Sequence, residues 1–203
     1  NDERGELNTM LLHAPDGRLR LRHLLPALAP LYDLVLIDTQ GARSVLLEMA
    51  VLASDKALSP VTPEILAARE LQRGTLQLID EIAPYRHLGI VPPALQLLIN
   101  RVHPVSSNAK LIKQALHEMF EGHAGVNVLN TDVPAIEAYP RASTRGLPVH
   151  RLEYRQPHGR VAPAALDTMQ ALAGELFPEW RERFALVTGR PDEAKGGRYG
   201  RRS

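Results

Sequence analysis

An acidic residue and a glycine follow an apolar run in residues 32–42, YDLVLIDTQGA. A carboxylate at the end of a buried strand can hold Mg²⁺, usually through water, and a nearby glycine lets a backbone N–H approach a terminal phosphate. Asp38 and Gly41 are therefore candidates for phosphate chemistry, with Thr39 and Gln40 between them. The same pattern also fits a strand that ends at the surface, where Asp38 caps the next helix and Gly41 makes the turn.

Strand and helix patterns alternate along the chain, which predicts an α/β fold with a mainly parallel sheet flanked by helices. The pattern at residues 34–37 has no polar interruption, as in a strand buried on both faces. The predicted strands are residues 34–37, 56–61, 95–99 and 126–129, and residues 10–14 could form another short strand. The predicted helices are residues 17–30, 43–53, 62–83, 107–121 and 164–177.

Several of these strands are followed by polar residues or by residues with special backbone properties. In a parallel sheet, ligands bind beyond the carboxyl ends of the strands. We therefore expect residues 38–41, 60–62, 100–101 and 131–134 to gather along one edge of the sheet. This convergence favours the phosphate interpretation of Asp38 over the helix-cap interpretation.

The composition allows one sizeable domain and excludes several classes of site. The chain has 203 residues, and 24 Lys and Arg nearly balance 23 Asp and Glu, so the overall charge does not indicate a nucleic-acid binder. The absence of cysteine excludes disulfides, thiolate zinc sites and a thiol nucleophile. The eight histidines have no metal-ligand spacing, and no apolar run approaches the roughly 20 residues of a membrane span.

Four stretches, in order, resemble blocks of the ParA/MinD family of deviant P-loop ATPases, and ParA-type partition proteins most of all. YDLVLIDTQGA resembles the Walker B segment of that family. The other stretches are AVLASDKALSPVTPEILAARELQRGTLQLIDEI, LQLLINRVHPVSSNAKLIKQAL and TDVPAIEAYPRASTRGLPVHRLEYRQPHGRVAPA. The resemblance extends over residues 17–180 and implies a P-loop NTPase fold that binds ATP and Mg²⁺.

The resemblance implies specific roles for the residues around Asp38. Asp38 would hold Mg²⁺ through water and help to place the attacking water, and Gly41 would be the switch glycine. Thr39 and Gln40 would line the γ-phosphate, although ordinary turn chemistry explains them equally well.

The resemblance also implies a base-binding edge later in the chain. Asn100, with Arg101 beside it, would contact adenine, because an asparagine amide offers both a donor and an acceptor. Asp132, Val133 and Pro134 would form the loop that walls the base. The simpler alternatives are that Asn100 only ends a strand and that the loop is an ordinary turn.

Two features depart from the family pattern. The phosphate loop, Lys-Gly-Gly-x-Gly-Lys-Thr, does not occur in the 203 residues, so the expected fold lacks its first strand and this loop. Gln40-Gly41 replaces the usual Pro-Pro and gives the Asp-x-x-Gly pattern with which other P-loop NTPases sense the γ-phosphate. We therefore expect the C-terminal two-thirds of a ParA-like ATPase domain, which alone would hydrolyse ATP poorly or not at all.

We expect three parts: a poorly defined segment at 1–16, the ParA-like domain at 17–185 and a basic, disordered tail at 186–203. The resemblance implies a cytoplasmic, nucleoid-associated bacterial protein that forms a homodimer, responds to a ParB-like partner and binds DNA without sequence preference. Candidate DNA contacts, which could equally be a solvated basic surface, are Arg141, Arg145, Arg151, Arg155 and Arg160.

Two other functions compete with the partition ATPase. One is a non-catalytic ParA-like scaffold or localisation protein that keeps the fold without a nucleotide cycle. The other is a different ATP-dependent enzyme of the same superfamily, such as a synthetase or reductase subunit, although the lack of cysteine argues against iron–sulfur relatives.

Overall fold

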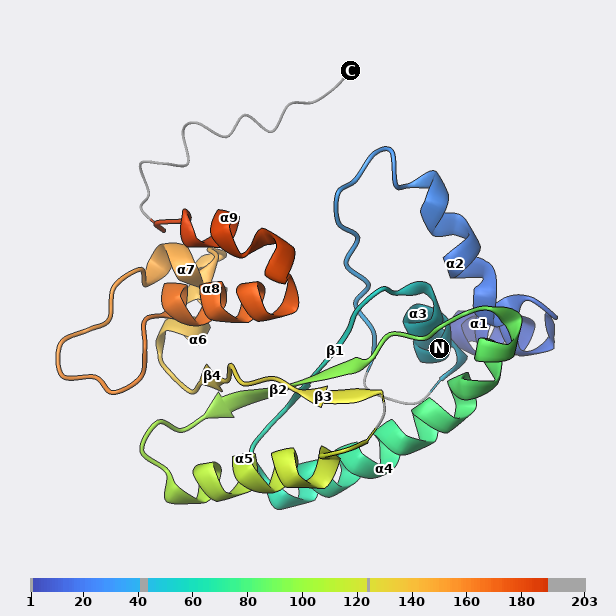
Figure 1. The fold of residues 1–203 in the computed structure, drawn as a ribbon. Coiled ribbons are helices and arrows are strands. Elements are labelled where there is room, and N and C mark those ends of the chain that lie inside the picture. The colour runs from blue at the N-terminus through green and yellow to red at the C-terminus, as the bar shows by residue number, and fades with distance from the viewer. Residues whose placement is uncertain (1, 41–43, 124, 190–203) are drawn as a thin grey trace. The chain divides into compact units, whose positions relative to one another are not determined.

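The computed structural model describes residues 2–40, 44–123 and 125–189 (Figure 1). The chain forms two compact units. Described residues of 1–59, 66–97 and 119–127 belong to the first unit, and those of 60–65, 98–118 and 128–203 belong to the second.

The described residues contain a sheet with the order β1-β2-β3, in which β4 also pairs with β2. The strands are β1 (Ala57–Val61), β2 (Leu95–Val102), β3 (Val126–Val128) and β4 (Val133–Pro134). β4 runs parallel to β2, and Leu97 and Ile99 in the middle of β2 are fully buried. The predicted α/β fold, with a mainly parallel sheet flanked by helices, is therefore confirmed, and it is consistent with a P-loop NTPase-like fold.

The first unit has a core built by two helices and the turns beside them. Its elements are α1 (Asp2–His13), η1 (Gly17–Leu19), α2 (Arg20–Leu24), η2 (Leu25–Ala27), α3 (Val45–Ala53), most of α4 (Ile65–Ile82) and η3 (Ala83–Leu88). Val51 and Leu52 of α3 pack with Leu78 and Ile82 of α4, and Ile90 completes this buried cluster. Leu78 and Ile82 are four residues apart and lie on one face of α4, which packs against α3, a helix whose buried residues include the consecutive Ala50 to Ala53.

Polar contacts fix the beginning and the side of α3. Ser44 caps the helix, because its hydroxyl accepts a hydrogen bond from the backbone N–H of Leu47 at 3.3 Å. Glu48 in the first turn forms an ion pair with Arg18. Arg22 of α2 donates to the carbonyl oxygen of Leu52 at 2.9 Å, so the segment before the helix is tied to both of its ends.

The prediction of a short strand at residues 10–14 was wrong, because α1 (Asp2–His13) covers most of this stretch. A helix satisfies its hydrogen bonds within its own segment, whereas a strand needs a neighbour. Leu11 is buried while Met10 and Leu12 are exposed, so one apolar residue of the run packs inward.

The prediction of a strand at residues 34–37 was also wrong. The segment forms no strand, and the sheet among the described residues does not include it. Leu34, Val35 and Leu36 are 47%, 42% and 83% exposed. An apolar run becomes a strand only where a neighbouring strand supplies hydrogen-bond partners, and the described strands supply none here.

The second unit collects the later helices around the ends of β2 and β4. Its helices are most of α5 (Ser107–Phe120), then α6 (Ala138–Arg145), α7 (Val149–Leu152), α8 (Ala165–Leu176), η4 (Pro178–Trp180) and α9 (Arg181–Ala185). Leu98, Leu129 and Val133 are buried together against Tyr139 of α6 and against Met169, Leu172 and Leu176 of α8. Figure 1 shows α6 to α9 grouped as successive neighbours, and α8 contacts both α7 and α9.

Most predicted elements with long apolar patterns are confirmed within a few residues. These elements are β1, β2, β3, α3, α4, α5 and α8, and the predicted helix at 17–30 is the broken run η1, α2 and η2. The short elements β4, α6, α7 and α9 are not predicted by the sequence pattern.

The described start of the predicted tail is attached to the second unit. Gln170 of α8 donates to the carbonyl oxygens of Phe184 and Val187 at 2.8 and 2.7 Å. Gly189 is buried with φ +69°, and a Cβ there would lie 2.5 Å from the carbonyl oxygen of His150. The remainder of the predicted tail, residues 190–203, lies outside the described residues.

Candidate functional site

The end of β2 and strand β4 bring together two of the predicted site segments. Asn100 lies opposite Val133, and Val102 lies opposite Pro134, with an irregularity between the two positions. The N–H of Ala135 donates to the carbonyl oxygen of Val102 at 2.8 Å. Val133 and Pro134 are buried, whereas Asn100 is half-buried, so the asparagine is the more accessible group at this edge.

Asn100 and Arg101 have an unusual local geometry. The Asn100 Oδ1 atom accepts a hydrogen bond from the backbone N–H of Arg101 at 2.9 Å. Arg101 has φ +60°, a left-handed conformation that is uncommon for a residue with a side chain and that is often found at functional sites. The amide retains its NH₂ donors and a second oxygen lone pair, which are the groups that could read the edge of a base.

Asp132 is paired inside the protein. Its Oδ2 atom accepts from Lys113 Nζ of α5 at 2.6 Å, and the same ammonium lies 3.4 Å from the carbonyl oxygen of Asn130. Both side chains of the pair are about one-third exposed, at 31% and 30%. Asp132 therefore shapes the loop, and because Val133 and Pro134 are buried, the groups left for a ligand are the backbone of the loop and the half-buried Asn100.

A glutamate of α8 holds the residues just before Asp132. Glu175 Oε1 accepts from the backbone N–H of Asn130 at 2.7 Å and from its side-chain Nδ2 at 3.1 Å. Glu175 Oε2 accepts from the backbone N–H of Thr131 at 2.9 Å. Burial alone would raise the pKa of Glu175, but the hydrogen bonds from Asn130 and Thr131 outweigh it, so the pKa is lowered.

The roles of Lys113 and Glu175 are not predicted by the sequence. Glu175 lies between Leu172 and Leu176 in a helix predicted from its apolar face, and a lone glutamate there has no local signal of function. Its partners are 44 and 45 residues away along the chain, and Lys113 is 19 residues from Asp132.

The predicted phosphate segment has a different character. Asp38, Thr39 and Gln40 are exposed, belong to the first unit and lie in neither a helix nor a strand. Gly41, the predicted switch glycine, lies outside the described residues. Among the described residues of this segment, Asp38 offers one exposed carboxylate, so the Mg²⁺ role stays a prediction.

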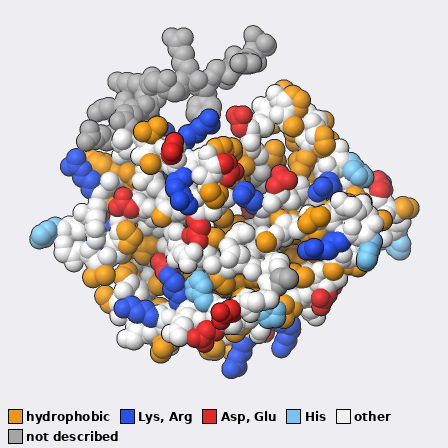
Figure 2. Space-filling model, in the orientation of Figure 1, with side chains coloured by type: hydrophobic (Ala, Val, Ile, Leu, Met, Phe, Trp, Pro, Cys, Tyr) orange, Lys and Arg blue, Asp and Glu red, His pale blue; other side chains and the backbone are white. Residues whose placement is uncertain are grey.

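Four of the five predicted DNA-contacting arginines are exposed in the second unit. Arg141 and Arg145 belong to α6, and Arg151 belongs to α7. Arg155 is also exposed, and its guanidinium lies 5.7 Å from the ring centre of Tyr154. On the face shown in Figure 2, Lys and Arg side chains are interspersed with acidic and hydrophobic ones.

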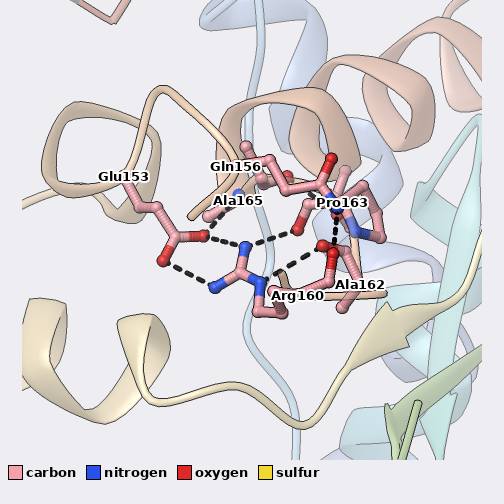
Figure 3. Close-up of polar contacts among 8 residues, drawn as sticks. Glu153, Gln156, Arg160, Ala162, Pro163 and Ala165 are labelled. Atoms are coloured by element: carbon pink, nitrogen blue, oxygen red, sulfur yellow. Dashed lines mark hydrogen bonds and ion pairs between the residues drawn. The ribbon is translucent and has the colours of Figure 1, made fainter. Parts of the chain in front are cut away.

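The fifth arginine, Arg160, is committed to an internal contact. Figure 3 shows its guanidinium facing the carboxylate of Glu153, with N–O distances of 2.8 and 2.5 Å. Arg160 also donates to the carbonyl oxygens of Ala162 and Pro163. This bidentate geometry is that of a structural clasp, and the arginine has few donors left for a phosphate.

Glu153 in turn caps α8. Its Oε1 atom accepts from the backbone N–H of Ala165, the first residue of the helix, at 3.1 Å. A carboxylate is stabilised at this end of a helix by the helix dipole. The hydrogen bond from Arg160, and to a smaller extent that from Ala165, lowers the pKa of Glu153 against the opposing effect of burial.

Comparison with known proteins supports a ParA-like relationship. The chain is 33% identical over 132 residues to a ParA family protein of Chlamydia pneumoniae. The matched region is 64% of this chain and 48% of that relative, so the chain spans about half the length of the curated relative it matches. No model of a known protein family matches the chain. Among the described residues, no helix combines the length and the hydropathy that crossing a bilayer would require.

Proposed function

We propose that this chain carries the base-binding edge and the Walker B segment of a ParA-type partition ATPase. The observation that supports this most is the 33% identity over 132 residues with a ParA family protein. The second support is geometric: Asn100, near the carboxyl end of β2, lies opposite Val133, which follows the carboxyl end of β3, and ligands of α/β sheets bind at such ends.

In this proposal the base of the nucleotide would be held from two segments. The Asn100 amide would bond the edge of adenine, and the backbone around Val133 and Pro134 would wall the base. Arg101 would lie at the mouth of the same edge, and Asp38 would hold Mg²⁺ through water, with Thr39 and Gln40 near the γ-phosphate. The ATP–Mg²⁺ complex supplies the phosphoryl group that such proteins transfer to water.

The whole-protein activities are also part of the proposal. ATP binding would favour a homodimer that binds DNA without sequence preference, and a ParB-like partner would stimulate hydrolysis. This cycle would serve the segregation of a chromosome, a plasmid or an integrated mobile element. Of the basic block, we retain Arg141, Arg145, Arg151 and Arg155 as DNA contacts, because Arg160 is paired with Glu153.

Nucleotide binding by variants of the base edge tests the central part of the proposal. We expect Asn100→Ala to weaken MgATP binding by about three- to tenfold, the worth of one or two hydrogen bonds. Asn108→Ala is a matched control, because Asn108 is an exposed asparagine of α5. Equilibrium dialysis with MgATP and with MgGTP measures both affinity and base preference. Equal MgATP affinity of Asn100→Ala and the unchanged chain would contradict the proposal.

A non-catalytic ParA-like scaffold is the second candidate. The exposed, unpaired state of the Asp38 segment favours it, since a catalytic carboxylate is normally held on a rigid element. We expect the 203-residue chain to hydrolyse MgATP poorly or not at all. Clear turnover that is abolished by Asp38→Ala, but kept by Asp33→Ala, would overturn this expectation and reject the scaffold. Asp33 is a suitable control because it is an exposed aspartate of the same segment.

A further inference from the structure

We propose that Glu175 is a positioning residue for the base-binding edge, an inference that rests on the proposed function. Both oxygens of its carboxylate accept hydrogen bonds from the segment at Asn130 and Thr131, at 2.7 to 3.1 Å. Hydrogen bonds to an ionised acceptor are among the stronger ones in proteins. The carboxylate is thus committed to holding the backbone that leads into Asp132 and β4.

A second helix holds the same segment through a charge of the opposite sign. Lys113 of α5 pairs with Asp132 at 2.6 Å and approaches the Asn130 carbonyl at 3.4 Å. The Glu175 carboxylate therefore accepts from N–H groups of Asn130 and Thr131, and the Lys113 ammonium donates to oxygen atoms of Asn130 and Asp132. Such alternating contacts define the path of the backbone and the direction in which its peptide groups point.

Apolar anchors at both ends of the segment limit what Glu175 itself must do. Leu129 and Val133 are buried and pack with Leu172 and Leu176, which flank Glu175 on α8. Removing the carboxylate leaves these anchors in place. We therefore expect the segment between them to become mobile while the second unit stays folded.

The consequence for binding is preorganisation. Val133 pairs with Asn100 across β2 and β4, so the geometry of residues 130–132 sets where the loop lies relative to the Asn100 amide. A loop that is already ordered costs a ligand less entropy on binding. Loss of the Glu175 carboxylate should consequently weaken the binding of adenine nucleotides, although Glu175 does not touch the base in this proposal.

Amide hydrogen exchange by NMR tests the clamp itself. In Glu175→Ala, protection of the Asn130 and Thr131 amides should fall by about tenfold or more, because each loses a charge-assisted bond. Glu175→Gln should show a smaller loss, since one acceptor oxygen remains. Glu179→Ala, at an exposed glutamate of η4, is the matched control and should leave both amides unchanged. Unchanged protection in Glu175→Ala would overturn the proposal.

The MgATP affinity of the same variants distinguishes a positioning role of Glu175 in binding from a purely structural role in the fold. With circular dichroism unchanged, Glu175→Ala should bind MgATP about three- to tenfold more weakly, and Glu179→Ala should bind as the unchanged chain does. Loss of protection without loss of affinity would also overturn the proposal. If the unchanged chain binds no MgATP, the proposed function fails instead. In that case the NMR signal of the Asn100 side-chain amide tests the positioning role. Glu175→Ala should shift this signal if Glu175 sets the geometry of the edge, and an unchanged signal would overturn the proposal.

Discussion

The proposed base-binding edge and the Asp38 segment have similar patterns in the sequence, yet they differ in the structure. Each was expected as a strand end followed by polar residues. The edge at Asn100 and Val133 is paired, buried on one side and held by charged groups of two helices. The apolar residues 34–36 are exposed, and no described strand pairs with them. An apolar run indicates a tendency to form a strand, but the strand forms only where a neighbouring strand offers hydrogen-bond partners.

The largest expected effect is a difference in stability between two leucine truncations. Leu129 is 1% exposed beside the base edge, so Leu129→Ala should lower the free energy of unfolding by about 3 kcal/mol through lost burial and a cavity. Leu36 is 83% exposed, so Leu36→Ala should change it by less than about 0.5 kcal/mol. Urea unfolding measures both. Equal losses of unfolding free energy would show that residues 34–37 are packed in solution as tightly as the segment around Leu129.

The next effect concerns the clasp that supports α8. Glu153→Ala removes a carboxylate that pairs with Arg160 and caps Ala165, and it leaves the guanidinium without its counter-charge. The two side chains are 16% and 23% exposed, so we expect a loss of about 2 kcal/mol rather than the full cost of a deeply buried pair. Glu179→Ala is the control on an exposed glutamate. A loss of unfolding free energy below about 0.5 kcal/mol would contradict a stabilising role for the contact between Glu153 and Arg160.

A smaller effect should appear in the pH dependence of stability. The pKa of Glu175 is lowered from its ordinary value of 4.5, so its contribution is present above that value and is lost as the pH falls through the folded-state pKa. Glu175→Gln should therefore be less stable than the unchanged chain by about 1 kcal/mol at neutral pH. This difference should shrink in acid. Urea unfolding at several pH values checks the trend, and a constant difference would contradict it.

The smallest effect on the folded protein is expected from the exposed arginines. Replacing Arg141, Arg145 and Arg151 by alanine should leave stability within about 0.5 kcal/mol but should weaken binding to nonspecific DNA. The slope of affinity against salt should fall by about 0.9 for each phosphate contact removed. Replacing Arg69, Arg73 and Arg86, which are exposed arginines of the first unit, is the matched control. Equal salt slopes for both triple variants would reject this basic block as the DNA surface.

The elements that could be predicted are those with strong local signals. The amphipathic pattern of α4 follows the Thr62-Pro63-Glu64 start signal, and the apolar run of β2 ends at polar residues. Local pattern and tertiary packing agree in these elements. The run at 34–37 had an equally strong local pattern, but strand formation depends on contacts that the pattern does not contain.

The candidate site could be predicted only in part, for the same reason. Asn100, Asp132 and Val133 follow from the rule that ligands bind at the carboxyl ends of parallel strands. Glu175 and Arg160 do not, because their roles come from hydrogen bonds to groups that their own segments do not identify. In the sequence Arg160 belongs to the same basic block as the other four candidate DNA contacts, and its pairing with Glu153 is visible only in three dimensions.

The most direct test of the account is an NMR titration of the 203-residue chain with MgATP. Binding should be weak, roughly millimolar, because the sequence contains no lysine-bearing phosphate loop. We expect concentration-dependent shifts of the Asn100 side-chain amide and of the backbone amides of Thr131 to Val133. Shifts confined to other parts of the chain, or no shifts at millimolar MgATP, would contradict the assignment of this edge to nucleotide binding.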